Sequence, residues 1–227
     1  LGTRLEVQSV LVRRLDAKRA FPIDPSLLTT DPYEVIAGKD LVVELIGGVD
    51  PAYEYVMTAL KNGSAVITGN KALIASRGPE LFAAAREANT RLYFEAAVAG
   101  AIPVIGALTS SLRGDRVRQI AGVVNGTTNF ILDQMTTQGA DYGEALAQAQ
   151  ELGFAEADPS ADVEGYDASA KCAIMSSLSF GRWVSVESVP RQGITALSTD
   201  DIALAERLGY VIKLVARAQY DEEAGEP

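Results

Sequence analysis

The sequence predicts an α/β fold, in which a partial Rossmann-like domain is followed by a second, α+β domain. In the first hundred residues, short apolar runs alternate with amphipathic stretches, a pattern typical of parallel strands joined by helices. After about residue 100 this alternation stops, and several helical stretches lie among two further strands. We therefore assign residues 1–100 to the first domain and residues 101–227 to the second.

The expected strands and helices of the first domain alternate along the chain and are separated by short turns. The near-continuous apolar run at 41–46 is typical of a strand that is buried in a parallel sheet. Pro51 favours the start of the next helix, and Gly63 suits its C-terminal cap. The predicted order is strand 6–12, strand 41–46, helix 51–62, strand 65–68, helix 79–89 and strand 91–95.

The second domain is expected to be mainly helical, because most of its apolar residues recur at helical spacing. Two runs between these helices are expected to form strands. The predicted order is helix 102–112, strand 117–124, helices 127–137, 141–152, 166–179 and 199–208, and strand 211–218.

The composition excludes several kinds of catalytic site. The chain has 227 residues, no histidine and a formal net charge of −10. Histidine triads, histidine-ligated zinc and imidazole acid–base steps are therefore excluded, and the negative charge argues against a nucleic-acid partner. Acid–base chemistry would fall to Asp, Glu, Lys, Tyr or Cys. Among only six lysines, Lys71 and Lys171 lie in apolar or glycine-rich surroundings.

Cysteine usage and hydropathy indicate a cytoplasmic protein with no membrane partner. Cys172 is the only cysteine, so no intrachain disulfide can form, which fits a reducing compartment. No apolar run approaches the roughly 18 residues of a membrane span, and no signal peptide is visible. Cys172 is expected inside a helix, as a small core residue rather than a nucleophile.

The strand expected at 6–12 resembles the second strand of a dinucleotide-binding fold, because no G-x-G-x-x-G turn is present. We therefore expect a strand, a glycine-rich loop and a helix before Leu1 in the natural protein. Arg13 and Arg14 close the strand, where an arginine suits the 2′-phosphate of NADP. Spacing alone leaves solvated surface arginines as an equal alternative.

Two turns follow strands at the sheet edge where such folds bind cofactors. Ile46-Gly47-Gly48 follows the strand at 41–46, and Thr68-Gly69-Asn70-Lys71 follows the strand at 65–68. Lys71 could donate a proton or attract a carboxylate in a cleft between the domains. The alternatives are an ordinary glycine turn and a surface lysine.

Two segments have both a structural and a functional interpretation. Glu95 precedes a run of small residues whose carbonyl groups, with one carboxylate, could ligate a monovalent cation; more often such runs allow tight packing. Asn-Gly-Thr-Thr-Asn at 125–129 could line a polar pocket or cap the helix that follows, and capping is the default.

The densest group of candidate residues lies between Glu156 and Lys171, where five carboxylates fall within twelve residues. Asp167 and Lys171 are four residues apart on a predicted helix, so both side chains leave the same face. An exposed pair of this kind contributes only about 0.3–0.5 kcal/mol. The residues around Lys171 are small or apolar, however, and the absence of histidine makes this lysine the leading acid–base candidate.

Six motifs stand in one order along most of the chain. They are Val-Glu-Leu-Ile-Gly-Gly at 43–48, Gly-Asn-Lys-Ala-Leu-Ile-Ala at 69–75, Phe-Glu-Ala-Ala-Val-Ala-Gly at 94–100, Asn-Gly-Thr-Thr-Asn at 125–129, Ala-Gln-Glu-Leu-Gly-Phe-Ala-Glu-Ala-Asp-Pro at 149–159 and Asp-Val-Glu-Gly-Tyr-Asp-Ala-Ser-Ala-Lys at 162–171. Together they resemble the homoserine dehydrogenase family, and the last two are highly specific.

The resemblance implies an NAD(P)-dependent oxidoreductase of amino-acid biosynthesis. Its substrates would be aspartate semialdehyde and homoserine, on the branch toward threonine, methionine and isoleucine. Members of the family are usually homodimers or larger. Residues 1–100 would then form an incomplete nucleotide-binding domain, and residues 101–227 a substrate-binding, catalytic and dimerisation domain.

The resemblance also implies roles for residues of the substrate site. Lys171 resembles the proton donor to the developing alkoxide, and Lys71 the second lysine, where cofactor and substrate meet. Glu156 would bind the ammonium group of the substrate. Asp162 and Asp167 would hold the substrate and the catalytic lysine in place.

Cofactor and cation sites follow from the same resemblance. The cofactor, NADP with NAD as the alternative, would contact a set of four residues: Arg13, Ile46, Gly47 and Lys71. A sodium-like ion would be held by one carboxylate and three backbone carbonyl groups: those of Glu95, Val98, Gly100 and Ile102.

The sequence departs from the family pattern in a few places. Gly69 replaces the usual alanine, and the glycine-rich segment before Leu1 and the family's final segment are missing. We expect the chain alone to bind NADPH poorly.

One alternative function is that of a semialdehyde dehydrogenase that forms a thioester. It would need a cleft cysteine and usually a histidine. The remaining alternative is a catalytically inactive nucleotide-binding module of the same fold, against which the intact acidic and lysine residues argue.

Overall fold

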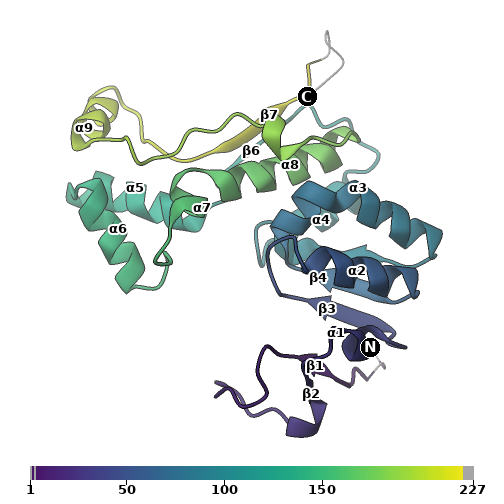
Figure 1. Cartoon of the computed structure of the whole chain (residues 1–227). Helices are drawn as coiled ribbons and strands as arrows, with labels where there is room; N and C mark the ends of the chain where they lie inside the picture. The colour runs from purple at the N-terminus through teal and green to yellow at the C-terminus, as the bar shows by residue number, and fades with distance from the viewer. Residues whose placement is uncertain (1, 3, 222–227) are drawn as a thin grey trace. The chain divides into compact units, whose positions relative to one another are not determined.

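The computed structural model describes residues 2 and 4–221, and the chain separates into two compact units, Leu1–Ala96 and Ala97–Pro227 (Figure 1). The first unit contains a parallel sheet with helices, and the second contains mainly helices and one pair of antiparallel strands. The predicted α/β fold class is therefore confirmed. Within the part of the chain that is described, no helix is long and apolar enough to cross a membrane.

A three-stranded parallel sheet forms the centre of the first unit (Figure 1). Its strands lie in the order β3 (Leu41–Glu44), β4 (Ala65–Thr68) and β5 (Leu92–Tyr93). Helices α2 (Ala52–Lys61) and α3 (Lys71–Glu87) connect successive strands. The predicted alternation of parallel strands and helices is confirmed.

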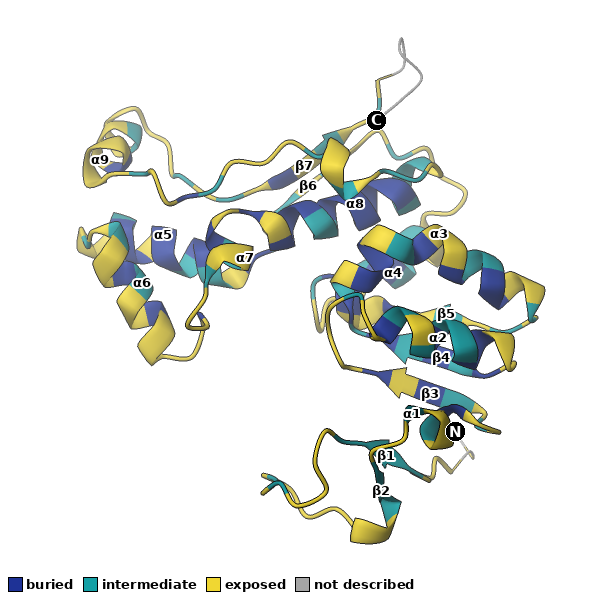
Figure 2. Cartoon of the chain, viewed as in Figure 1, coloured by how far each residue is buried: buried dark blue, intermediate teal, exposed yellow. Residues whose placement is uncertain are grey.

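One face of this sheet carries the core of the first unit. Val42 and Val66 pack there against Leu60 of α2 and Leu73 of α3, and all four side chains are buried. Each such side chain stabilises the fold by about 1.5–3 kcal/mol. The expected continuous burial of strand 41–46 is wrong: Val43 is 56% exposed, because the described helices cover one face only (Figure 2).

The segment before the sheet forms a small separate pair of strands. β1 (Val10–Leu11) pairs in parallel with β2 (Leu28–Thr29), which follows the short helix η1 (Pro25–Leu27) and precedes α1 (Pro32–Ile36). The predicted strand at 6–12 is therefore too long, because its only partner strand among the described residues has two residues.

Helix α3 begins eight residues before the expected start at 79. The Asn70 side chain accepts a hydrogen bond from the backbone N–H of Leu73 at 3.1 Å and so caps the helix. Pro79, the first residue of the predicted helix, lies inside α3. Buried apolar residues on both sides of Pro79, among them Ile74 and Leu81, hold the helix together across it.

The second unit is built largely of helices, as predicted. Its elements are α4 (Val104–Gly106), the π-helical turn η3 (Ala107–Ser111), β6 (Gln119–Gly122), α5 (Gly126–Gln138), α6 (Tyr142–Glu151), α7 (Ser160–Val163), α8 (Tyr166–Phe180), η4 (Val186–Ser188), α9 (Thr199–Arg207) and β7 (Ala216–Gln219). β6 and β7 pair antiparallel beside α8 (Figure 1). Both strands are shorter than predicted, and α7 was not predicted.

The core of the second unit fixes the N-terminal end of α5. Ile131 and Leu132 of α5 pack with Ala149 of α6 and Ile202 of α9. Asn129 adds a pair of hydrogen bonds to the backbone of Leu214: its amide donates to the carbonyl at 3.1 Å, and its oxygen accepts from the N–H at 3.0 Å. The chain before β7 is thereby attached to the first turns of α5.

Candidate active site

One lysine and two aspartates lie together in the second unit. They lie where the segment after β6 and the start of α5 meet α7 and α8. Lys171 Nζ lies 2.7 Å from Asp167 Oδ2 and donates to the carbonyl oxygen of Val124 at 2.7 Å. The Asn125 amide donates to Asp162 Oδ1 at 2.6 Å and to Asp167 Oδ2 at 2.9 Å. The arrangement is a hydrogen-bonded network that contains two carboxylates and one ammonium group.

Burial gives this network its chemical character. The side chain of Asp167 is 4% exposed, whereas that of Lys171 is 16% exposed. The carboxylate is therefore held away from bulk water, while the ammonium group keeps a limited path to it. A positioned ammonium group with such access is suited to proton transfer.

A glycine at the junction of α7 and α8 makes this geometry possible. Gly165 has φ +82°, a left-handed conformation that side-chain-bearing residues rarely adopt. The turn at this residue joins the two helices, and Asp162 on α7 and Asp167 on α8 both accept hydrogen bonds from the same amide. Val163 is buried beside the turn and anchors it in the core.

The structure does not bring Glu156 into the network. Its side chain is exposed, and the contact that holds this position is a hydrogen bond from Gln150 Nε2 to the Glu156 carbonyl at 3.0 Å. Nearby, the Ser160 hydroxyl and backbone N–H both donate to Asp158, which lowers the pKa of that carboxyl group. The role of Glu156 stays a prediction.

A second polar network, in the first unit, lies at the carboxyl ends of β3 and β4. Glu44 is 4% exposed and accepts hydrogen bonds from Ile46 N–H at 2.7 Å, Gly47 N–H at 3.3 Å and the Thr68 hydroxyl at 2.5 Å. Asn70 donates to the carbonyl oxygen of Gly48 at 2.6 Å. The two turns that were singled out in the sequence are thus hydrogen-bonded to each other.

Glu44 was missed in the sequence because it stands inside an apolar strand. The only signal was a carboxylate in an otherwise apolar run, and a buried carboxylate is rare unless it is paired or hydrogen-bonded. Here the charge is balanced by backbone and hydroxyl donors, which fix the Ile46–Gly48 turn. Gly47 and Gly48 have φ +79° and +71°, so the turn needs glycine at both positions.

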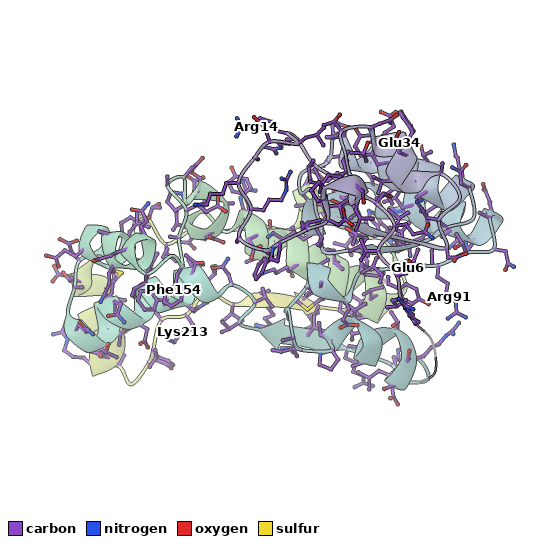
Figure 3. The ribbon with its side chains drawn as sticks, turned by 90° about the horizontal axis from the view of Figure 1, so that it is seen from below. Glu6, Arg14, Glu34, Arg91, Phe154 and Lys213 are labelled. Carbon is purple, nitrogen blue, oxygen red and sulfur yellow. The ribbon has the colours of Figure 1, made fainter. Side chains whose placement is uncertain are left out.

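Lys71 and Arg13 occupy different settings in the first unit. Lys71 is the first residue of α3, directly after the capping Asn70, and it is half-buried rather than a loop lysine. Arg13 is exposed in the loop after β1, together with Arg14, which is labelled in Figure 3. Arg19 stabilises this loop by donating to the carbonyl oxygens of residues 14, 15 and 17.

Of the residues predicted to hold a cation, Glu95 is the first residue of the short helix η2 (Glu95–Ala97), and the other three follow that helix. Ala99 and Ala101 have φ +49° and +67°, which is unusual for residues other than glycine. Among the described residues, no group of three or more Asp, Glu or Cys side chains could hold a metal ion. The backbone carbonyl ligands stay a prediction.

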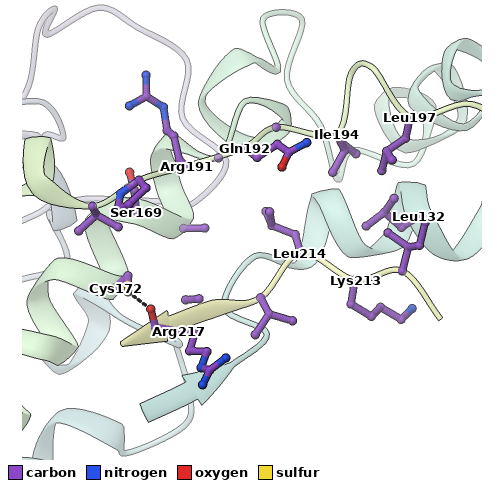
Figure 4. Close-up of a pocket in the computed structure, with 18 residues that line it drawn as sticks. Leu132, Ser169, Cys172, Arg191, Gln192, Ile194, Leu197, Lys213, Leu214 and Arg217 are labelled. Atoms are coloured by element: carbon purple, nitrogen blue, oxygen red, sulfur yellow. Dashed lines mark hydrogen bonds between the residues drawn. The ribbon is translucent and has the colours of Figure 1, made fainter. Parts of the chain in front are cut away.

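A cavity of about 410 Å³ lies in the second unit, against α8 and the segments 189–194 and 212–217 (Figure 4). Cys172 lines it but is only 3% exposed, and burial raises the pKa of its thiol. Its Sγ lies 3.7 Å from the Arg217 carbonyl oxygen. The prediction that Cys172 is a buried helix residue is confirmed, and Lys171 does not line this cavity.

Family models and curated relatives that match this chain all name the same family. A family model described as "Homoserine dehydrogenase, NAD binding domain" matches residues 2–95, and one described as "Homoserine dehydrogenase" matches residues 103–225. The homoserine dehydrogenase of Corynebacterium glutamicum is 50% identical over 218 residues, which cover 95% of this chain and 49% of that protein. That of Bacillus subtilis is 44% identical over 223 residues, covering 97% and 52%. The chain spans about half the length of the curated relatives it matches.

Solved structures agree with these matches. A homoserine dehydrogenase from Thiobacillus denitrificans superposes with a TM-score of 0.84 at 48% identity, over 86% of this chain and 46% of that one. A hyperthermophilic archaeal homoserine dehydrogenase in complex with NADPH gives 0.71 at 32% identity, over 83% and 56%. Since family models match both parts of the chain, the chain belongs to the homoserine dehydrogenase family.

Proposed function

We propose that the protein containing this chain is a homoserine dehydrogenase, which reversibly reduces L-aspartate 4-semialdehyde to L-homoserine with NAD(P)H. The observation that carries the proposal is the bonded pair of Lys171 and Asp167, linked through Asn125 to Asp162. This network lies in the region that the catalytic family model matches. It supplies an acid–base group in a chain without histidine.

The residues of the network have distinct tasks in this reaction. When bound, NADPH would supply the hydride that reduces the aldehyde carbon. Lys171 donates a proton to the aldehyde oxygen, so that the product carries a hydroxyl group, and it accepts that proton in the reverse direction. Asp167 and the Val124 carbonyl hold Nζ, while Asp162 and Glu156 attract the ammonium group of the substrate. Such positioning can account for much of the rate enhancement.

Residues 1–100 are proposed to bind the nucleotide. The Ile46–Gly48 turn fits a cofactor because its backbone is fixed by a buried carboxylate and lies at the carboxyl edge of a parallel sheet. Leu45 and Ile46 are exposed at this edge, 76% and 42%, and offer apolar surface to a ring. Lys71 stands next to the adjoining turn. Arg13 would contact the 2′-phosphate, which favours NADP over NAD.

A monovalent cation such as sodium is proposed at Glu95 and the carbonyl groups of Val98, Gly100 and Ile102. One carboxylate and several carbonyl oxygens are suitable ligands for a hard cation of low charge. Ala99 and Ala101, which lie between these carbonyl groups, have left-handed backbone conformations, so the loop has an irregular backbone. No step of the reaction is assigned to the ion.

Residues 101–227 are proposed to bind the substrate, carry the catalytic lysine and mediate dimerisation. A cytoplasmic homodimer or larger homo-oligomer, active in threonine, methionine and isoleucine biosynthesis, is the assembly that the family membership favours. The alternative of an inactive nucleotide-binding module has no support, since the relatives compared above are all named as dehydrogenases.

The test is an assay of the intact protein for homoserine-dependent reduction of NADP, followed through the absorbance of NADPH. L-2-Aminobutyrate, which lacks the hydroxyl group, is the matched control substrate. We expect rapid reduction with homoserine, none with the control, and NADPH oxidation when aspartate semialdehyde is supplied. Absence of both reactions in a folded, NADP-binding protein would refute the proposal.

A further inference from the structure

The side chain of Asn125 makes more hydrogen bonds than capping of a helix requires. Its Oδ1 accepts the backbone N–H of Thr128 at 2.8 Å and the Thr128 hydroxyl, and so caps α5. Its Nδ2 points the other way and donates to Asp162 at 2.6 Å and Asp167 at 2.9 Å. Because ionised carboxylates only accept hydrogen bonds, these four contacts fix the orientation of the amide.

The two amide hydrogens are matched to two different carboxylates. Each N–H serves one aspartate, so Asn125 brings two like charges to one nitrogen and offsets part of their repulsion. Asp167 Oδ2 then accepts from both Asn125 and Lys171. The orientation of the carboxylate that holds the lysine is therefore set from two sides.

We propose that Asn125 is a positioning residue for the reaction: its amide clamps Asp162 and Asp167 in the orientation that presents Lys171 to the substrate. The inference rests on the proposed function and assigns a role to a residue outside its substrate and catalytic set. Asn125 acts through Asp162 and Asp167 and does not itself transfer a proton.

The backbone of Asn125 is anchored as firmly as its side chain. The Asn129 amide donates to the Asn125 carbonyl at 2.9 Å, and the same nitrogen bonds the Leu214 carbonyl. Both asparagines are buried, 4% and 9% exposed. Hydrogen bonds within α5 and to the segment before β7 therefore fix the position of Asn125, as precise positioning of the carboxylates requires.

Capping alone cannot explain the choice of asparagine. Aspartate and serine cap helices about as well as asparagine, because each offers an oxygen to the backbone N–H groups. Only asparagine offers that oxygen and also two donors for the carboxylates. The cap and the clamp can therefore be separated by substitution.

The experiment compares Asn125→Asp, Asn125→Ser and Thr128→Val in the intact protein. Asn125→Asp keeps the cap but places a third carboxylate against Asp162 and Asp167. We expect a lower melting temperature, because like charges gather in a buried site, and in the folded variant a kcat lower by about 100-fold and a KM for NADP within about twofold. Asn125→Ser keeps the cap without added charge and should lower kcat by about tenfold.

Thr128→Val serves as the matched control, because it removes a hydrogen bond on the capping side only and should leave kcat within about threefold. A loss of kcat below tenfold in a folded Asn125→Asp protein overturns the proposal. If that variant does not fold, Asn125→Ser decides, and a kcat within threefold of the wild type overturns it.

A structural measurement separates this inference from the proposed function. If the wild-type protein shows no homoserine-dependent activity, the proposed function fails, and the crystal structure of Asn125→Ser still tests the clamp. We expect the Asp162 carboxylate to turn away from Asp167 in that structure. Unchanged positions of both carboxylates would show that Asn125 does not hold them.

Discussion

Lys171 Nζ and Asp167 Oδ2 are 2.7 Å apart on the first two turns of α8, and the same lysine nitrogen bonds the Val124 carbonyl. The lysine is thus held between a helix and the segment that follows β6, at a residue 47 positions away in the sequence. One ionic and one neutral acceptor fix the direction of Nζ. A third N–H of the ammonium group is left for a substrate oxygen.

Replacing Lys171 by alanine is expected to lower kcat for homoserine oxidation by about 10³-fold, because the reaction loses its proton-transfer group. The matched control is Lys213→Ala, which removes a lysine whose ion pair with Asp133 is 3.5 Å long and solvent-exposed. The control should keep nearly full activity. Steady-state kinetics of both variants check this, and a normal rate for Lys171→Ala would exclude the assigned role.

Asp167→Asn is expected to affect stability as well as activity. It removes the charged partner of a lysine that is only 16% exposed, which should cost about 3 kcal/mol of unfolding free energy, near the lower end for a broken buried pair. Urea unfolding of the wild type and variant measures the difference. A loss below about 0.5 kcal/mol would mean that the pair behaves as an exposed one.

The sequence predicted the pairing of Asp167 with Lys171 because helical spacing alone places residues four apart on one face. It could not predict that Asn125 joins Asp162 to Asp167, since those contacts span 37 and 42 residues. Local rules correctly predicted that Asn125 caps a helix. The contacts of Asn125 with the two aspartates depend on tertiary packing, which cannot be predicted from a local sequence pattern.

The fold was predicted best where local and tertiary preferences agree. Strand 65–68 and the helices predicted at 127–137 and 166–179 match the structure, because their apolar spacing also fits the core. Helix α3 was predicted to start too late: it continues through Pro79, because burial of Ile74 and Leu81 outweighs the lost hydrogen bond of proline. The other strands were predicted too long, because the length of the partner strand, and not the length of the apolar run, limits the pairing.

Glu44→Ala is expected to weaken cofactor binding more than catalysis. The substitution leaves the Thr68 hydroxyl and the Ile46 N–H without their buried acceptor, which costs about 1–3 kcal/mol of stability and loosens the turn. We expect KM for NADP to rise about tenfold, the equivalent of about 1.4 kcal/mol, with a smaller change in kcat.

The matched variant for this position is Glu44→Gln, which keeps an acceptor oxygen for the backbone and a group that the Thr68 hydroxyl can bond. Its KM for NADP should stay within about threefold of the wild type. Equal effects of the two substitutions would show that the charge of Glu44, rather than its hydrogen bonds, supports the cofactor.

Arg13→Ala is expected to lower kcat/KM for NADP by about tenfold and to leave kcat/KM for NAD unchanged, since only NADP carries the 2′-phosphate. Lys18→Ala, at an exposed position in the same loop, is the control for a general loss of positive charge. Parallel assays with both cofactors check the prediction. An equal loss with NADP and NAD would assign Arg13 to the loop structure.

Cys172→Ala is expected to retain kcat within about threefold, because the thiol has no place in the proposed chemistry. The side chain is 3% exposed and burial raises the pKa of the thiol, so at pH 8 it stays protonated and poorly nucleophilic. A thiol reagent should therefore label the native protein far more slowly than the unfolded protein, and the native rate should rise only at alkaline pH. Since Cys172 is the only cysteine, all labelling reports this position. Rapid native labelling together with loss of activity in the alanine variant would instead favour thioester chemistry, which the buried thiol makes physically unfavourable.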